Sequence, residues 1–184
     1  GRRIAVRIPA YGQHMVYAAL EGAAVGLVMG LTDAEIAAGV AAYHTVGRRG
    51  VVYSTGYITL IDDCYNANPD SMRCAVDSLT ALPGRHVCVL SDMREMGQDS
   101  PAMHKELGEY ALAHGVDFVA AYGPMSAYLT AAMGSRAHHF ETKAELIAAL
   151  PGLIRRGDNV LVKASLGMHL EDAAEALKRL GGEE

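Results

Sequence analysis

The sequence predicts an α/β fold: a Rossmann-like, doubly wound, mostly parallel sheet, preceded by a helix pair and a β-hairpin. From residue 62 onward, short apolar runs alternate with helical patterns, the order found in sheets covered on both faces. The runs His86–Leu90, Asp117–Ala121 and Asn159–Val162 are mostly apolar, as in strands buried on both sides. Hydrophobic residues make up 51% of the 184 residues and charged residues 20%, so the chain can form a packed core.

The first part of the chain has a different pattern. We expect a strand at Ile4–Ile8 and a helix from about His14 to Met29, which Gly30 ends. Thr32 and Glu35 fit a capping box that opens a second helix. Val51–Tyr53 and Tyr57–Ile61 predict the two strands of a hairpin. This set leaves faces without partners, so we expect residues 1–61 to be the tail of one domain and residues 62–184 to form a second domain.

Helix signals in the second part are clear. Asn68 and Pro69 are typical of a helix start. The helix that follows carries one apolar stripe, formed by Met72, Ala75, Val76 and Leu79. Further helices are expected at about Ser100–His114, Met125–Met133, Thr142–Leu150 and Met168–Leu180, and Thr142 with Glu145 fits a second capping box.

Composition excludes several classes of function. The formal net charge is -5 and no block of Lys or Arg occurs, which argues against a nucleic-acid surface. No apolar run approaches the roughly 20 residues of a membrane span, and no signal peptide is visible, so a cytoplasmic protein is expected. The three cysteines form no CxxC pair and predict reduced thiols. His138 and His139 are adjacent, hence on opposite faces of a strand, so no metal site is predicted.

Two features point to a ligand site. In open α/β sheets ligands bind outside the carboxyl ends of the strands, where residues 91–97, 122–124 and 163–167 are expected to lie. Residues 62–72 also gather short polar groups between a strand and a helix N-terminus, which suits an anionic ligand. On spacing alone a well-capped loop without a ligand remains the alternative.

Residues 62–72 (Asp-Asp-Cys-Tyr-Asn-Ala-Asn-Pro-Asp-Ser-Met) resemble the hinge motif of the Mur ligases that add D-alanyl-D-alanine, in which Cys64 is usually Ser. Other segments resemble the same family in the same order. These are Tyr11 to His14 (the family's Gly-x-His), Gly47-Arg48, residues 90–97 with the later His104, and residues 162–168. The resemblance covers essentially the whole chain.

The resemblance implies a three-domain ligase, of which this chain is the last third of the central ATPase domain and all of the C-terminal domain. It implies ATP and Mg²⁺ as cofactors, and a UDP-N-acetylmuramoyl tripeptide and D-alanyl-D-alanine as substrates, in a monomer. The family activates the tripeptide carboxylate as an acyl phosphate, which the dipeptide amine attacks. A carboxylate is otherwise a poor electrophile, and cations stabilise the transferring phosphoryl group.

On the nucleotide side, the resemblance implies four residues. Arg48 would reach the ATP phosphates, with a surface arginine in a turn as the alternative. Asp63 would accept hydrogen bonds from the ribose hydroxyls, and Asp62 is the alternative in register. His14 lies in the Gly-x-His segment and is assigned to the same side.

On the substrate side, the resemblance implies six residues. Asn66 and Asn68 would shape the hinge loop. Lys163 and Ser165 would hold the dipeptide carboxylate or the acyl phosphate, with a solvated strand-end lysine as the alternative for Lys163. Asp92 and Arg94 are added as substrate-binding candidates, although the family pattern fixes no basic residue at position 94.

The chain departs from the family pattern at several positions. Met15 and Ala18 replace two asparagines that hold the adenine and its surroundings, and Leu166 replaces an arginine. Ser91 and Ala164 replace glycines. No Gly-x-x-x-x-Gly-Lys-Ser/Thr loop is present, so the isolated chain is not expected to hydrolyse ATP. A degenerate relative that keeps only the fold is therefore the alternative function. A dinucleotide-dependent oxidoreductase is disfavoured because no Gly-x-Gly-x-x-Gly follows a predicted strand.

Overall fold

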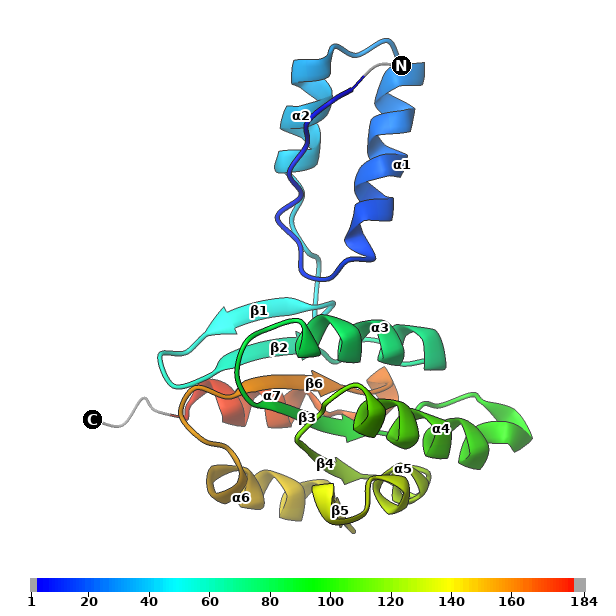
Figure 1. Cartoon of the computed structure of the whole chain (residues 1–184), viewed down its shortest axis with the longest axis vertical. Helices are drawn as coiled ribbons and strands as arrows, with labels where there is room; N and C mark the ends of the chain where they lie inside the picture. Colours follow the sequence, from blue (N-terminus) through cyan, green and yellow to red (C-terminus); the bar gives the residue numbers. More distant parts are fainter. Residues whose placement is uncertain (1–2, 181–184) are drawn as a thin grey trace. The chain divides into compact units, whose positions relative to one another are not determined.

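A computed structural model describes residues 3–180 and divides the chain into two compact units, residues 1–46 and residues 47–184. The first unit contains helices α1 (Met15–Val28) and α2 (Asp33–Ala41) (Figure 1). The predicted capping box opens α2: Thr32 Oγ1 accepts from the Glu35 N–H at 3.3 Å, and the Glu35 carboxylate accepts from the Thr32 N–H at 2.8 Å. The structure thus confirms both predicted helices of the first unit, α1 near residues 14–29 and α2 after the Thr32 cap.

The strand expected at Ile4–Ile8 is wrong. Residues 3–10 have no regular secondary structure. A strand needs a neighbour that accepts and donates its ladder hydrogen bonds. Among the described residues, every strand belongs to the second unit, so residues 4–8 have no such neighbour within their own unit.

The first unit exposes much of its apolar surface. A pocket of about 380 Å³ lies between α1 and α2, and its lining includes Ala19, Ile36 and Val40. Several large apolar side chains of α1 and its end are exposed: Val16, Tyr17, Leu20, Val25, Val28 and Met29. Apolar surface on this scale is typical of a part that packs against further structure.

The second unit is built on one six-stranded sheet. Its strands are β1 (Val51–Ser54), β2 (Thr59–Asp63), β3 (His86–Ser91), β4 (Phe118–Tyr122), β5 (Ala137–Phe140) and β6 (Asn159–Lys163). The order across the sheet is β1-β2-β6-β3-β4-β5 (Figure 1). The β1–β2 pair is antiparallel and the other four pairs are parallel. The carboxyl ends of β2 to β6 therefore lie at the same edge of the sheet.

Helices cover both faces of this sheet. One layer consists of α3 (Pro69–Thr80), α4 (Ser100–Ala113) and α5 (Ser126–Met133), in which α4 packs on both neighbours. Helices α6 (Lys143–Leu153) and α7 (Glu171–Lys178) pack together on the opposite face. Their apolar side chains join one strand face in a core that includes Leu60, Val87, Val89, Val160, Val162, Leu146, Leu150 and Leu177. The predicted doubly wound, mostly parallel α/β fold is confirmed.

The compact units divide between residues 46 and 47 and not between residues 61 and 62, the boundary expected from the sequence, because the hairpin belongs to the second unit. Strand β2 pairs with β6 along its whole length, from Thr59 opposite Asn159 to Asp63 opposite Lys163. A boundary at residue 62 would cut through these hydrogen bonds. The compact unit begins at Gly47 instead.

Two smaller differences and one confirmed detail concern single elements. Strand β5 was not among the apolar runs predicted as strands, because its sequence Ala-His-His-Phe has no such run, but it contains His138 and His139, which were expected on opposite faces of a strand. The last helix begins at Glu171 rather than Met168, since Leu166–Met168 form a 3₁₀ turn, η3. The predicted apolar stripe of α3 is buried as expected, and Asn68 caps this helix by accepting from the Ser71 N–H at 2.8 Å.

Candidate functional site

The sheet register brings three polar loops together at the carboxyl edge. Asp63 at the end of β2 lies opposite Lys163 at the end of β6, and Lys163 lies opposite Leu90 on β3. The loops that follow these strands are therefore neighbours: residues 64–68 after β2, called the hinge loop below, residues 92–97 after β3 and residues 164–168 after β6. This is the edge at which open α/β sheets bind ligands.

Lys163 is buried and paired with acceptors of the protein. Its side chain is 3% exposed, and Nζ donates to Asp63 Oδ2 at 2.5 Å and to the Asn66 carbonyl at 2.8 Å. A buried ammonium needs such partners, since an unpaired charge in the interior is costly. The ammonium thus ties the hinge loop to the end of β6, and its position is fixed by acceptors of the protein itself.

The two aspartates at the end of β2 have different surroundings. Successive side chains of a strand point to opposite faces. Asp63 faces Lys163, and its side chain is 21% exposed. Asp62 is completely buried and faces Arg48 and Lys178. Of the two ribose candidates, Asp63 is the accessible one.

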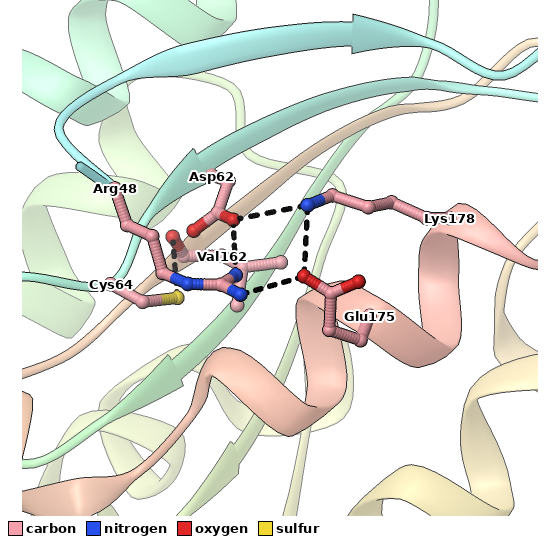
Figure 2. A network of polar contacts seen from close by, with 6 residues as sticks. All are labelled: Arg48, Asp62, Cys64, Val162, Glu175 and Lys178. Atoms are coloured by element: carbon pink, nitrogen blue, oxygen red, sulfur yellow. Dashed lines mark hydrogen bonds and ion pairs between the residues drawn. The ribbon is translucent and has the colours of Figure 1, made fainter. Parts of the chain in front are cut away.

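Arg48 is held in a network of four charges (Figure 2). Its Nη1 lies 2.6 Å from Asp62 Oδ2, and its Nη2 lies 2.6 Å from Glu175 Oε1. Lys178 reaches the same two oxygens, at 3.6 Å and 3.0 Å. Hydrogen bonds from the Arg48 and then the Lys178 side chains lower the pKa of Glu175. Both cations thus compensate the charge of a buried carboxylate, one oxygen of which, Asp62 Oδ1, has no hydrogen-bond partner among residues 3–180.

Cys64 lies beside this network (Figure 2), and its thiol is unreactive. Its thiol is buried and lies 3.6 Å from the Val162 carbonyl, to which it donates. Burial raises the pKa of the Cys64 thiol, and the neighbouring Asp62 carboxylate raises it further. The thiol therefore stays protonated and is a buried side chain that donates to a strand carbonyl.

Asp92 anchors helix α5. Its Oδ1 accepts from the Ser126 N–H and from Ser126 Oγ, both at 2.7 Å, and its Oδ2 accepts from the Met125 N–H at 3.2 Å. A carboxylate at a helix N-terminus accepts from the free N–H groups and is stabilised by the positive end of the helix dipole. Gly123 permits this approach: with φ +117°, a Cβ there would lie 2.5 Å from Asp92 Oδ1. Asp92 therefore positions the loop, and its carboxylate is already occupied.

Ser165 joins the loops after β3 and β6. Its N–H donates to the Asp92 carbonyl at 3.3 Å, and its Oγ accepts from the Arg94 N–H at 2.9 Å. The structure thus brings three of the predicted residues, Asp92, Arg94 and Ser165, into one hydrogen-bonded cluster. Lys163 lies two residues before Ser165 and connects this cluster to the hinge loop.

The two asparagines of the hinge loop have separate tasks. Asn66 is exposed, and its carbonyl accepts from Lys163. Asn68 uses its side chain to cap α3. His14 lies in the first unit as the exposed N-cap residue of α1, where its side chain makes no capping hydrogen bond. The second unit therefore contains every predicted site residue except His14.

His104 supports the loop after β3, a role that sequence analysis did not assign. The ring is fully buried in α4; Nε2 accepts from the Met93 N–H at 2.9 Å, and Nδ1 lies 2.7 Å from the Ser100 carbonyl. Nδ1 therefore carries the proton. The signal in the sequence was a polar residue beside the apolar stripe of a helix, which alone does not indicate its partner.

No three His, Cys, Asp or Glu side chains gather in a metal-binding arrangement within the described part of the chain. Between residues 3 and 180, no helix is both long and apolar enough to cross a bilayer. The site is thus an edge of charged and amide groups beside a helix N-terminus, and it includes four cations, Arg48, Arg94, Lys163 and Lys178. This arrangement suits anionic substrates.

Comparison with known proteins identifies the class. The family described as "Mur ligase, glutamate ligase domain" matches residues 47–166, so the chain belongs to the Mur ligase family. The match begins at the first residue of the second unit. The ligase class implied by the hinge motif is therefore confirmed.

Particular relatives narrow the resemblance. The UDP-N-acetylmuramoyl-tripeptide--D-alanyl-D-alanine ligase of Escherichia coli K12 is 37% identical over 96% of this chain, and that of Haemophilus influenzae is 34% identical over 95%. Among solved structures, MurF from Acinetobacter baumannii is similar with a TM-score of 0.87 at 29% identity, over 95% of this chain and 39% of that one. The chain spans 39% of the length of both curated relatives. Nothing in these comparisons supports the alternative of a degenerate relative.

Proposed function

We propose that this chain is the C-terminal part of an ATP-dependent ligase that joins D-alanyl-D-alanine to a UDP-N-acetylmuramoyl tripeptide. The observation that carries the proposal is the 37% identity to the Escherichia coli ligase of that name, which extends over 96% of the chain and so includes both units. The carboxyl edge supports it, because the hinge loop, Lys163 and Ser165 meet there. The exposed apolar surface of α1 supports a first unit that packs against the remainder of an ATPase domain.

On the nucleotide side, we assign Asp63, Arg48 and His14. ATP would supply the phosphoryl group that converts the tripeptide carboxylate into an acyl phosphate. Asp63 is partly exposed and can accept from ribose hydroxyls, whereas Asp62 is buried. Arg48 must leave Asp62 and Glu175 to reach a phosphate, and Lys178 remains beside both carboxylates when it does. A MurF ligase from Thermotoga maritima, 25% identical to this chain, has been solved in complex with ADP.

The described residues do not fit Mg²⁺. Oxygen-rich sites for this cation use carboxylates and substrate phosphates. No cluster of three acidic or histidine side chains exists between residues 3 and 180, and both Asp62 and Asp92 are occupied by protein donors. The ATP-binding residues of this chain are likewise too few for tight binding, because the sequence lacks a phosphate-binding loop.

On the substrate side, the buried groups set geometry. Lys163 fixes the Asn66 carbonyl and the Asp63 carboxylate relative to each other, and Asn68 fixes the start of α3. Asp92 and Ser165 hold the loop that presents Arg94. Holding reactants in a fixed geometry is a general source of enzymatic rate enhancement.

The test is product formation by the full-length protein. With ATP, Mg²⁺, tripeptide precursor and D-alanyl-D-alanine, we expect ADP, phosphate and a product whose mass is that of the two substrates minus water. Omission of the dipeptide should abolish the product. If the full-length protein forms no dipeptide-dependent product, the proposal is wrong. The isolated chain should bind ATP no more tightly than about 1 mM, equivalent to about -4 kcal/mol.

A further inference from the structure

Arg94 is placed over the backbone of the turn that follows β6. Its own N–H donates to Ser165 Oγ, and its guanidinium covers Gly167. A Cβ on Gly167 would collide with Arg94 Nη1 and lie 3.2 Å from Cζ. The absence of a Cβ at Gly167 therefore leaves the space that the Arg94 guanidinium occupies, at the same edge as Lys163 and the hinge loop.

The Arg94 guanidinium is exposed and forms no ion pair with any residue between 3 and 180, so it can bind an anionic ligand. The loops 92–97 and 163–169 contain two cations, Lys163 and Arg94. Lys163 is used by Asp63 and Asn66. Arg94 is exposed, and none of the ion pairs found among residues 3–180 includes it. An arginine with free N–H groups presents a fork that matches a carboxylate.

The two loops are held in unusual backbone conformations. The described residues include two non-glycine residues with positive φ, Glu95 at +66° and His169 at +52°. One follows Arg94 directly, and the other closes the turn η3. Such conformations persist where surrounding contacts enforce them, as at functional sites. Here the contacts are the His104–Met93 hydrogen bond and the Ser165 hydrogen bonds, so Arg94 is carried by a fixed loop.

We infer that Arg94 binds the terminal carboxylate of the incoming dipeptide and sets the preference for an acceptor with a free carboxylate. This inference rests on the proposed ligase function. The Ser165 hydroxyl, which accepts from the Arg94 N–H, keeps its own hydrogen for a second bond to the carboxylate. The exposed Leu166 side chain beside it offers apolar contact for small methyl groups. Lys163, the other candidate for this carboxylate, is buried and donates to Asp63 and to the Asn66 carbonyl instead.

The experiment compares D-alanyl-D-alanine with its C-terminal amide in the full-length enzyme. Arg94→Gln should raise KM for the dipeptide about 10- to 150-fold, the loss expected for one charged hydrogen-bonded contact, while KM for ATP stays unchanged. The amide should be used equally by the wild type and by Arg94→Gln. Arg94→Lys should recover part of the loss. Arg156→Gln is the matched control, because Arg156 precedes β6 at the opposite edge of the sheet and contacts the Gly56 carbonyl.

Gly167→Ala provides a second variant that keeps the charge but displaces it. Its added Cβ meets the flexible end of Arg94, so the fold should tolerate it. KM for the dipeptide should rise, and the double variant with Arg94→Gln should be no worse than Arg94→Gln alone. If the wild type ligates the dipeptide and Arg94→Gln keeps the same carboxylate-to-amide preference, the inference is overturned and the proposed function stands. If the wild type ligates no dipeptide, both are overturned.

Discussion

Asp63 and Lys163, 100 residues apart in the sequence, are register partners in adjacent parallel strands and form a 2.5 Å ion pair. Lys163→Met should therefore lower the free energy of unfolding by about 3 kcal/mol, the lower end for a broken buried pair because Asp63 is partly exposed. The double variant with Asp63→Asn should recover part of this loss. Urea denaturation measures both. A loss below about 1 kcal/mol for Lys163→Met would mean that the pair does not fix the strand ends.

Glu175 should make stability depend on acid pH. Its pKa is lowered by Arg48 and Lys178, so its contribution is present above the unfolded pKa and is lost as the pH falls through the folded value. At pH 7, Glu175→Gln should lower Tm by up to about 4 °C, as for a partly exposed ion pair in a domain of this size. The difference from the wild type should begin to shrink as the pH falls below the unfolded pKa of about 4.3 and should vanish once the pH lies below the lowered folded pKa. A gap that does not shrink at all on acidification would assign the effect to packing instead of charge.

Gly123→Ala should destabilise the second unit by more than about 1 kcal/mol. The residue has φ +117°, and the added Cβ would strike the Asp92 carboxylate that caps α5. Gly152→Ala, in helix α6 with open space around it, is the matched control and should be neutral or stabilising. Chemical denaturation of both variants checks the pair. Equal stabilities would contradict the close approach of Gly123 to Asp92.

Limited proteolysis should leave a core that begins near residue 47. The hairpin is part of the sheet, since β2 pairs with β6. The first unit ends at Val46, and the segment around it has no regular secondary structure. Mass spectrometry of the resistant fragment identifies its first residue. A core beginning near residue 62 would favour the boundary expected from sequence, and an early cut inside 86–180 would contradict both.

Sequence patterns predicted an element well where the residues that determine it lie close together in the sequence. The buried stripe of α3 and the three caps at Thr32, Asn68 and Thr142 depend on residues within a few positions of each other. The strand expected at residues 4–8 is not formed, and the compact units divide at residue 47 instead of residue 62, for the opposite reason. Both depend on which strand lies alongside, and a pattern within one segment contains no information about its neighbour.

The candidate site was predicted as a set of residues but not as a set of contacts. The sequence located Asp62, Asp63 and Lys163 at strand ends. It did not predict that the Lys163 ammonium would donate hydrogen bonds to Asp63 and Asn66, because these contacts follow from the register between strands about 100 residues apart. The packing of Arg94 on Gly167 likewise joins loops after β3 and β6 that are adjacent only in the folded sheet.

The position of β6 has a consequence for synthesis of the protein. Among the strands formed by residues 3–180, β6 is the last to leave the ribosome, yet it lies between β2 and β3. Until residues 159–163 emerge, a nascent chain carries two apolar strands whose inner edges face no partner. Such edges are templates for pairing with other chains. A ribosome that stalls before residue 159, or a nonsense mutation upstream of it, should therefore yield an aggregating product, and chaperones that shield strand edges should matter most late in translation.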